Sequence, residues 1–440
     1  MSDRTQIIVL DDDPTGSQTV HSCLLLLKWD VATLKEALLD ASPIFFVLTN
    51  TRALGADEAA QITREVCHNL KQAIEEAGTE NFLVVSRSDS TLRGHYPVET
   101  DVIAEELGPF DAHFMVPAFF EAGRVTLEST HYIEVGGVRT PVHETEFAKD
   151  SVFGYSYSYL PDYVAEKTKG RIAADQVQRL TLTDIRGGTQ AQLRSLSGNV
   201  CVAVDSQQQS DLDQLAQDLL SVAGEGKRFL FRSAASLLTS LAALPQQPLA
   251  PEEMAQYARG RRPGSIIVGS HVQKTTQQLV ELLKLPDVKG VEVDVARLKA
   301  DLSQAAVLER EISAEVKEIY DGGLTPVVYT SREELTFDTT AERLAFGTAV
   351  SQLLMDVMHH LPADIGFLIS KGGITSNDTL SVGLGLTKVR LLGQIIPGVS
   401  VVRTEAGHPQ FPELPVVLFP GNVGDVDGVA VAYRRLRPLG

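Results

Sequence analysis

The sequence is poor in cysteine and in aromatic residues, and both shortages narrow what the protein can be. Its cysteines, Cys23, Cys67 and Cys201, are far apart and odd in number, so we expect neither a disulfide framework nor a thiolate metal site. Aromatic residues make up 6% of the chain and hydrophobic residues 43%, a balance that is ordinary for a globular enzyme. We therefore expect free thiols, buried as free cysteines usually are.

Long apolar runs and an excess of basic residues are also missing. The densest apolar stretch, residues 24–27, ends at Lys28, whereas a membrane helix needs about 20 apolar residues. Residues 1–4 lack the apolar core of a signal peptide. The formal net charge is −18, whereas nucleic-acid binding needs a surplus of Lys and Arg. We expect a cytoplasmic protein without a nucleic-acid or membrane partner, in which a few local arginines can still bind an anionic substrate.

Short apolar runs recur along the chain, and helical patterns such as residues 56–76 and 341–358 lie between several of them. The runs are residues 7–10, 44–48, 82–85, 114–116, 200–204, 229–231, 266–268, 291–293, 327–329, 365–369 and 416–419. Buried strands that alternate with helices form parallel sheets covered on both faces, and 440 residues suit two domains. We predict two three-layer α/β/α domains with mainly parallel sheets.

A proline-rich stretch marks the predicted domain boundary. Residues 244–251 hold Pro245, Pro248 and Pro251, and proline favours an extended connector because it fixes φ and removes a backbone donor. We predict an N-terminal domain over residues 1–243, a linker over 244–255 and a C-terminal domain over 256–440. Residues 123–170 are rich in tyrosine and poor in aliphatic runs. We interpret them as an insertion or long loop over a site.

In open parallel sheets, ligands bind at the carboxyl ends of the strands, so the residues after each apolar run are informative. Three ends in the first predicted domain, residues 11–17, 49–52 and 86–95, carry carboxylates, hydroxyls and arginines. Arginines bind a carboxylate through paired N–H donors, and a carboxylate can accept the proton of an attacking hydroxyl. The set suits a polyhydroxy carboxylic acid, although residues 11–13 alone could simply cap a helix.

The second predicted domain has glycine-rich strand ends instead. They are residues 269–271, 371–378, 396–399 and 419–425. Glycine lets backbone N–H groups approach phosphates closely. The named phosphate-binding loops and the protein-kinase signatures are absent from the sequence. These ends therefore indicate a nucleotide site of another lineage.

Taken together and in their order along the chain, these motifs resemble those of the four-carbon acid sugar kinase family. The family's Ala-Asp-Asp-Phe-Thr-Gly motif after the first strand corresponds to residues 11–16, and its Ser-x-x-Arg-Gly element to residues 90–94. Its glycine motifs correspond to residues 269–270, 372–375, 397–399 and 421–424. The resemblance implies an N-terminal domain that binds the sugar acid and a C-terminal domain that binds ATP.

The resemblance also implies the reaction and its residues. Members transfer the γ-phosphoryl group of ATP to the terminal hydroxyl of threonate, erythronate or 3-oxo-tetronate, and we expect D-threonate here. We expect the substrate to meet Asp12, Asp13, Arg52, Ser86, Arg87, Ser88, Asp89, Ser90 and Arg93, with Asp13 or Asp89 as the base. We expect the nucleotide to meet Ser270, Gly372, Gly373, Ile374, Thr375, Gly398, Gly421 and Asn422. Mg²⁺ would be held largely by the phosphates and water.

Several alternatives stay open. Pro14 replaces the family's aromatic residue, and residues 419–421 replace a Lys-Ser-Gly-type end, which removes a cation; Lys371 either replaces that cation or is a solvated surface lysine. His95 could touch the substrate, and so could residues 145–150. A metal-dependent phosphatase that uses residues 11–13, and a sugar-acid-binding module without catalysis, are the rival functions. The sequence leaves a homo-oligomer open.

Overall fold

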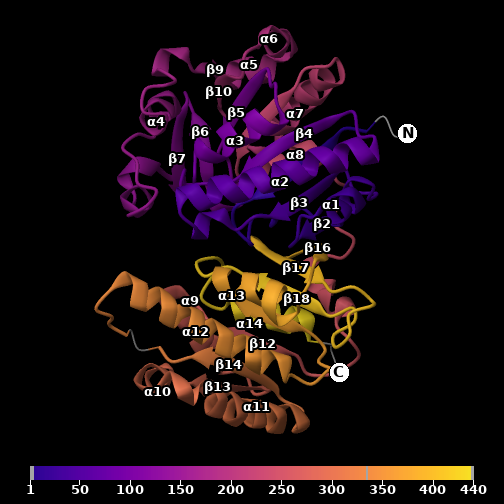
Figure 1. The fold of residues 1–440 in the computed structure, drawn as a ribbon, viewed down its shortest axis with the longest axis vertical. Helices are drawn as coiled ribbons and strands as arrows, with labels where there is room; N and C mark the ends of the chain where they lie inside the picture. The colour runs from indigo at the N-terminus through magenta and orange to yellow at the C-terminus, as the bar shows by residue number, and fades with distance from the viewer. Residues whose placement is uncertain (1–3, 333–334, 438–440) are drawn as a thin grey trace. The chain divides into compact units, whose positions relative to one another are not determined.

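The computed structural model describes residues 4–332 and 335–437 and divides into two compact units, Met1–Pro245 and Gln246–Gly440. Each unit has its own run of mainly parallel strands with helices between them (Figure 1). The predicted α/β fold with mainly parallel sheets is therefore confirmed. A 3₁₀ helix, Pro251–Tyr257, overlaps the end of the predicted linker, residues 244–255. The linker is therefore not extended throughout.

The strands of the first unit lie side by side in the order β2-β3-β1-β4-β11-β5-β10-β9, and each neighbouring pair is parallel. Their bounds are β1 Gln6–Asp11, β2 Leu24–Leu26, β3 Ile44–Leu48, β4 Phe82–Arg87, β5 Ala112–Val116, β9 Gln178–Leu180, β10 Val200–Val204 and β11 Phe229–Ser233. The central strands are buried along their length, as parallel strands covered on both faces must be.

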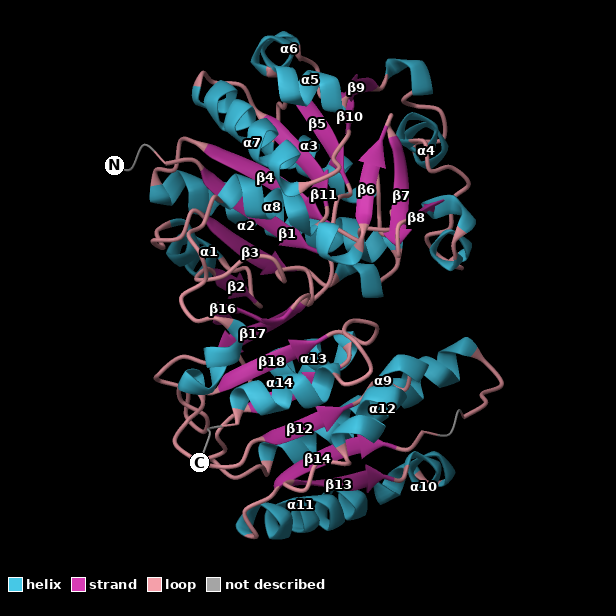
Figure 2. Ribbon diagram, turned by 180° about the vertical axis from the view of Figure 1, so that it is seen from behind, coloured by secondary structure: helices cyan, strands magenta, loops and turns pink. Residues whose placement is uncertain are grey.

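Helices cover both faces of these strands. They are α1 Val31–Leu38, α2 Ala56–Ala77, α3 Val98–Leu107, α4 Leu160–Lys167, α5 Leu182–Gly187, α6 Gln190–Ser195, α7 Gln209–Gly224 and α8 Ala235–Ala242. Helix α2 buries residues such as Val66 and Leu70 at helical spacing and ends at Gly78, whose φ of 65° suits glycine. It lies in front of the strands in Figure 1, whereas α7 lies in front of them in Figure 2.

Residues 123–170 are a folded segment, so their interpretation as a long loop was wrong. They form the antiparallel strands β6 Arg124–Leu127, β7 Thr130–Val135 and β8 Val138–Pro141, followed by short 3₁₀ turns and α4. Tyr155 and Tyr163 are buried. Their hydroxyls donate hydrogen bonds to the carbonyls of Thr91 at 2.6 Å and Leu92 at 2.8 Å. These tyrosines therefore hold the loop after β4 in place.

The second unit has the strand order β13-β14-β12-β15-β18-β17-β16. The first five strands are parallel, and β17 is antiparallel to both of its neighbours. The bounds are β12 Ser265–Val268, β13 Val288–Val293, β14 Thr325–Thr330, β15 Leu368–Lys371, β16 Lys388–Ile396, β17 Val399–Arg403 and β18 Pro415–Phe419. Strand β15 begins and ends later than predicted, and the β16–β17 hairpin was not predicted.

The helices of the second unit are α9 Gln273–Leu282, α10 Val295–Ala300, α11 Ala305–Asp321, α12 Thr340–His359, α13 Gly373–Asp378 and α14 Gly428–Leu436. Helices α9 and α14 pack through Leu282 and Tyr433 on a core that includes Ile266 and Phe367. Short 3₁₀ helices complete the chain at Thr51–Ala53, Phe120–Ala122, Val142–Glu144, Glu146–Lys149, Ala174–Gln176 and Leu302–Gln304, and a π-helical turn lies at Thr379–Gly383.

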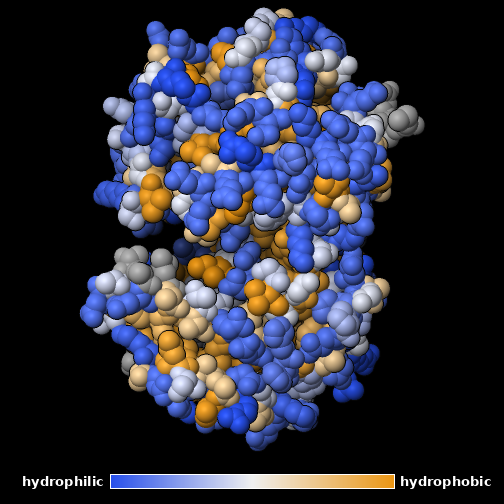
Figure 3. All heavy atoms as spheres, in the orientation of Figure 1, coloured by the Kyte–Doolittle hydropathy of each residue, from blue (hydrophilic) through white to orange (hydrophobic). Residues whose placement is uncertain are grey.

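The burial of the cysteines agrees with the expectation from the sequence. Cys23, Cys67 and Cys201 are buried and form no disulfide. In the part of the chain that the structure describes, no helix has both the length and the apolar character of a membrane span. Hydrophilic side chains cover most of the face drawn in Figure 3.

Candidate functional site

A cluster of charged side chains occupies the carboxyl ends of β1, β3 and β4. The parallel register places Asp11 opposite both Leu48 and Arg87, so the residues that follow the three strands meet at one edge. Arg52, in the 3₁₀ turn after β3, forms an ion pair with Asp13. Its Nη1 lies 3.5 Å from Asp89 Oδ1. Four residues that were predicted to bind substrate, Asp12, Asp13, Arg52 and Asp89, are thus brought together.

Arg87 and Asp11 form the buried base of this cluster. Arg87 Nη1 lies 3.2 Å from Asp11 Oδ1 and 3.9 Å from Asp12 Oδ1, and all three side chains are buried. Burial raises the pKa of Asp11 to about 7 against the opposing charge of Arg87. A Cβ at Gly16 would overlap the carboxylate of Asp11, so glycine is required there. Arg87 supports Asp11 and Asp12 and does not reach the solvent.

No helix follows Asp13, so the helix-capping alternative for residues 11–13 is wrong. Residues 14–19 form turns, and Asp13 Oδ1 accepts a hydrogen bond from the Thr15 amide at 2.8 Å. An aspartate that bonds to the amide two residues later closes a turn.

Arg232 and Glu99 complete the buried support, and sequence reasoning missed both. Arg232, on β11, donates from Nη2 to Ser88 Oγ at 2.7 Å and from Nη1 to Ser86 Oγ at 2.8 Å. Its Nη1 also lies 2.5 Å from Glu99 Oε2. Ser88 Oγ in turn lies 2.6 Å from Asp12 Oδ2. The available signal was a charged residue directly after the apolar run 229–231.

The loop after β4 is held tightly around this support. Gly94 has a φ of +115°, and a Cβ there would lie 2.6 Å from Arg232 Nη2, so a side chain is excluded. The Nε2 atom of His95 lies 3.1 Å from the Thr51 carbonyl and 3.0 Å from the Leu54 carbonyl. The buried His95 therefore orients the turn that carries Arg52. Ser90 is buried as well, and its carbonyl lies 2.8 Å from His131 Nε2.

Arg93 links this loop to the folded segment after β5. Its Nε lies 2.9 Å from Asp89 Oδ2, and its Nη1 lies 3.8 Å from Asp150 Oδ2. Its guanidinium also stands 5.0 Å from the ring centroid of Phe147. Residues 145–150 therefore lie beside Arg93. The sequence had suggested that they could lie near the substrate.

The two candidate bases differ in their surroundings. Burial alone would raise the pKa of Asp13, but Arg52, Arg87 and the hydrogen bonds from Thr15 together outweigh it and hold the pKa below the ordinary value. Asp89 is partly buried too, yet Arg52 and Arg93, with a hydrogen bond from Thr91, drive its pKa far below the usual range. The pKa of Asp12 is raised by burial despite Arg52. The Asp13 side chain is 23% exposed and that of Asp89 is 14% exposed, so Asp13 is the more accessible carboxylate.

A cavity borders this cluster. Its lining includes Ser88, Asp89, Arg93, Tyr163 and Arg232. Both carboxylate and guanidinium groups face it, and the apolar side chains of Leu92, Met115 and Pro117 line it as well. Carboxylate and guanidinium groups are of the kinds that bind a small acid with several hydroxyl groups.

In the second unit, three glycine-containing strand ends meet at the carboxyl edge of β12, β15 and β18. Gly372 has a φ of +125°, and a Cβ there would lie 3.0 Å from both Ser270 Cβ and Thr375 Oγ1. A Cβ at Gly421 would lie 3.3 Å from Ser270 Oγ. The Oγ1 atom of Thr275 lies 3.2 Å from Ser270 Oγ and donates to the Gly421 carbonyl at 3.0 Å. The backbones of these ends are therefore packed closely together.

The remaining residues predicted at the nucleotide lie around this edge. A Cβ at Gly373 would meet no atom within 4 Å, and Ile374 is 73% exposed. Asn422 is exposed as well. Gly398 lies in the turn between β16 and β17, with a φ of +76°. Because β17 runs antiparallel to β18, this turn lies at the carboxyl end of β18.

Lys371 is a buried residue, so its interpretation as a solvated surface lysine was wrong. It ends β15, and its Nζ donates to the carbonyls of Pro420 and, at 3.0 Å, Gly421. Nζ also stands 4.5 Å from the ring centroid of Phe419. Burial, with a smaller contribution from Lys274, lowers the pKa of Lys371 to about 7.

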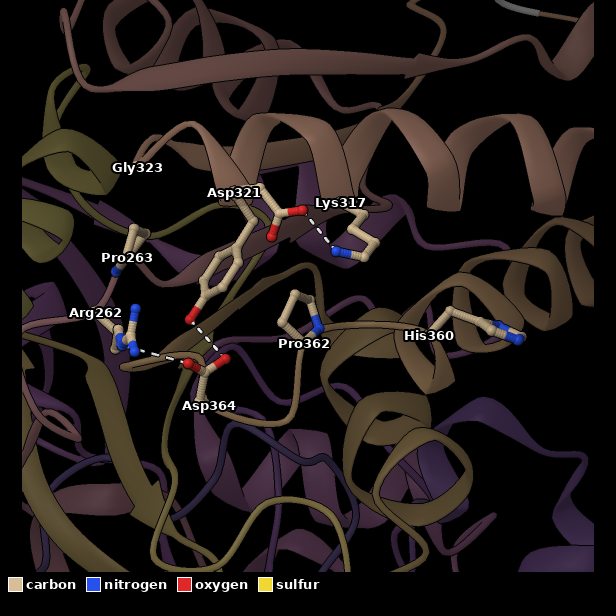
Figure 4. Close-up of a pocket in the computed structure, with 9 residues that line it drawn as sticks. Arg262, Pro263, Lys317, Asp321, Gly323, His360, Pro362 and Asp364 are labelled. Atoms are coloured by element: carbon tan, nitrogen blue, oxygen red, sulfur yellow. Dashed lines mark hydrogen bonds and ion pairs between the residues drawn. The ribbon is translucent and has the colours of Figure 1, made fainter.

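The described residues contain no metal cluster, and the second unit has a cavity away from the predicted residues. Among residues 4–332 and 335–437, no three His, Cys, Asp or Glu side chains are grouped to hold a metal ion. A cavity of the second unit, drawn in Figure 4, lies at the amino ends of β12, β14 and β15 and contains none of the predicted residues. Its charged groups pair with one another, Arg262 with Asp364 and Lys317 with Asp321.

Comparisons with known proteins cover the whole chain. Residues 7–241 match the family model of a sugar-binding N-terminal domain, and residues 265–429 match that of a nucleotide-binding C-terminal domain. D-erythronate kinase of Heliobacterium modesticaldum is 25% identical over 465 residues, with 98% of this chain and 97% of the relative covered. D-threonate kinase of Bordetella bronchiseptica is 24% identical over 441 residues, with 98% and 97% covered.

Solved structures share the fold. A Salmonella typhimurium LT2 protein described as a putative tRNA synthase superposes with a TM-score of 0.71 at 19% identity, over 99% of both chains. A Haemophilus influenzae protein superposes with a TM-score of 0.65 at 19% identity, over 98% of this chain and 100% of the other. At these identities the likeness concerns the fold alone.

The raised pKa of Asp11 predicts a pH-dependent stability. The folded protein holds this proton up to a pH of about 7, whereas an ordinary aspartate releases it near 3.8. Between these values the folded state binds the extra proton, so the contribution of Asp11 to the free energy of unfolding falls as the pH rises. Replacing Asp11 by asparagine removes this contribution, and the variant loses less stability than the natural protein between about pH 5 and about pH 8.

Urea unfolding at the two pH values, followed by the fluorescence of the single tryptophan, Trp29, measures this difference. Trp29 belongs to the same unit as Asp11. Equal losses of stability in the natural protein and in the Asp11→Asn variant would show that Asp11 titrates normally.

Proposed function

Because the chain belongs to the four-carbon acid sugar kinase family, we propose that it transfers the γ-phosphoryl group of ATP to the terminal hydroxyl of D-threonate. D-erythronate and 3-oxo-tetronate are the alternative acceptors. The protein is a phosphotransferase that acts on a sugar acid, as both kinase relatives are. The observation that carries the proposal is the aspartate–arginine cluster at the carboxyl ends of β1, β3 and β4.

The exposed fractions of the side chains suggest which residues of the cluster bind the acid and which support those residues. Arg52 and Arg93 have side chains 18% and 30% exposed, and their guanidinium groups suit the planar carboxylate of the acid. Arg87, Asp12 and Ser86 are buried; we assign them to the support beneath the ligand. Binding the carboxylate through Arg93 would leave the far end of the four-carbon chain free for the chemistry.

Asp13 is our choice for the base. Phosphoryl transfer depends mostly on positioning and on neutralising charge, and a carboxylate that accepts the hydroxyl proton adds to the rate. Asp89 is held by both Arg52 and Arg93 and by Thr91, which makes it the weaker base. We assign Asp89 to orienting the two arginines.

For the nucleotide, we propose the edge formed by Ser270, Gly372–Thr375, Gly398, Gly421 and Asn422. Glycine lets a backbone approach phosphates closely, and Gly373, Ile374 and Thr375 form the first turn of α13, whose N–H groups have no partner within the helix. The open space beside Gly373 and the exposed side chain of Ile374 provide room and an apolar contact for the nucleotide. Mg²⁺ would neutralise phosphate charge, bound chiefly by the phosphates and water.

A panel of four-carbon acids tests the activity. Incubation with Mg·ATP and each acid is expected to release ADP in an acid-dependent manner, with the highest kcat/KM for D-threonate. A coupled assay for ADP measures this rate. Release of phosphate from phosphorylated sugars without ATP would indicate the phosphatase instead, and binding of the acids without turnover would indicate the binding module.

Asp13→Asn tests the base. The variant keeps the shape of the side chain but cannot accept the proton, so kcat is expected to fall about 10²- to 10⁴-fold. The dissociation constant of ATP, measured by calorimetry, should not change. Arg52→Ala should also cripple turnover without affecting ATP binding, because it removes a guanidinium group that is proposed to bind the carboxylate of the acid. The matched control is Asp57→Asn, which changes an exposed aspartate on α2. An equal loss of kcat in this control would contradict the assignment of Asp13 as the base.

Gly373→Val tests the nucleotide edge. Because a Cβ at Gly373 meets no protein atom within 4 Å, valine there fills open space without disturbing the packing. ATP affinity is expected to fall at least about tenfold, while the affinity for the acid stays unchanged. Gly407→Val, in a loop at the other end of β18 where a Cβ also meets no atom within 4 Å, is the control. Unchanged ATP affinity in Gly373→Val would contradict the assignment of this edge.

A further inference from the structure

Arg332 forms no ion pair with any described carboxylate. It lies two residues after the end of β14, and its Nη1 donates to the Ser270 carbonyl at 2.7 Å. Its Nε and Nη2 donate to the Thr330 carbonyl at 2.8 and 2.6 Å. Among residues 4–332 and 335–437, no carboxylate oxygen lies within 4.0 Å of an Arg332 side-chain nitrogen, so its partners are neutral oxygens. Burial also lowers the pKa of Arg332, with partial compensation from Glu292.

Lys274 and Lys371, near the same strand ends, also bond to neutral carbonyl oxygens. Lys274, in the first turn of α9, is exposed, and its Nζ lies 3.3 Å from the Gly424 carbonyl. Lys371 donates to the carbonyls of Pro420 and Gly421. Three cations thus surround residues 269–270 and 420–424 with carbonyl and hydroxyl oxygens as their described partners.

This concentration of charge is unusual in a chain with 57 acidic and 39 basic residues. In the cavity of Figure 4, by contrast, Arg262 lies 3.3 Å from Asp364 and Lys317 lies 2.6 Å from Asp321. Unpaired cations repel one another and are stabilised by an anionic ligand. The strand ends of the second unit therefore suit a strongly negative group, and those of the cavity do not.

The three cations are not equivalent. Lys371 is fully buried, and its hydrogen bonds hold the carbonyls of Pro420 and Gly421, which makes it a positioning residue. Arg332 is partly exposed and Lys274 is exposed, so both side chains can turn toward a ligand. A guanidinium offers several donors to phosphate oxygens, and an ammonium acts as a mobile point charge.

We propose that Arg332 and Lys274 bind the phosphate groups of the nucleotide, while Lys371 holds the loop after β18 that borders them. This inference rests on the proposed function, since it takes the second unit to be the nucleotide site. It adds two residues that the motifs do not contain. It also assigns the phosphate end of the nucleotide to the side of the edge where β12, β14 and α9 meet.

The test compares nucleotides with and without phosphates. Arg332→Gln and Lys274→Gln are each expected to weaken ATP binding about tenfold, measured by titration calorimetry on the full chain. Adenosine lacks phosphates, so its affinity should stay within about twofold of the natural protein's. Raising the salt concentration should weaken ATP binding less in the variants than in the natural protein, because fewer charges contribute.

Arg262→Gln and Lys317→Gln remove a cation of each kind from the cavity of Figure 4 and serve as matched controls; they should leave ATP affinity unchanged. The proposal would be overturned by unchanged ATP affinity in Arg332→Gln and Lys274→Gln, or by an equal loss for adenosine and ATP. Failure of the natural protein itself to bind ATP would refute the proposed function instead. The two failures are therefore distinguishable.

Discussion

The burial of Asp11 and Asp12 against Arg87 and Arg52 is the constraint on which the first unit's site depends. Charged groups removed from water are costly unless each has a partner and further hydrogen bonds. The parallel register of β1, β3 and β4 provides those partners, since it places the ends of the three strands at one edge. Removing one partner would leave a buried charge unpaired, which commonly costs about 3–5 kcal/mol.

The two units distribute charge in opposite ways. At the site of the first unit, Arg52, Arg87, Arg93 and Arg232 each lie within 4.0 Å of a carboxylate. At the glycine-rich ends of the second unit, the described partners of the cations are neutral oxygens. The first pattern suits a ligand with both a carboxylate and hydroxyl groups, because donors and acceptors alternate. The second suits a polyphosphate, which has acceptors only.

The sequence predicted strands that are buried on both faces. The runs 44–48 and 200–204 coincide with β3 and β10, because a short continuous apolar run between turn residues is typical of a strand in the middle of a parallel sheet. The sequence did not predict β6–β8 or the β16–β17 hairpin. Strand β7 buries alternate residues, but one of the two is His131, and β8 buries none. Strand β16 is irregular in register, so none of the three shows a clear apolar pattern in the sequence.

Residues whose role depends on distant partners were also missed. Arg232 and Glu99 are far apart in the sequence and form one ion pair under the site, and Arg332 reaches Ser270 only through the pairing of β12 with β14. Such contacts depend on strand order, which single-sequence patterns do not contain. Lys371 illustrates the same limit, because a lysine after a strand is as compatible with solvent as with the buried position that it occupies.

Hydrogen–deuterium exchange with each ligand alone tests most directly whether the two chemistries belong to the two units. D-threonate should slow exchange in peptides that contain residues 11–16, 50–54 and 87–95, and leave the second unit unchanged. A non-hydrolysable ATP analogue should slow exchange at residues 269–275, 371–377 and 420–424, and leave the first unit's site unchanged. Protection of the first unit's site by the nucleotide, or of the glycine-rich ends by the acid, would contradict the account.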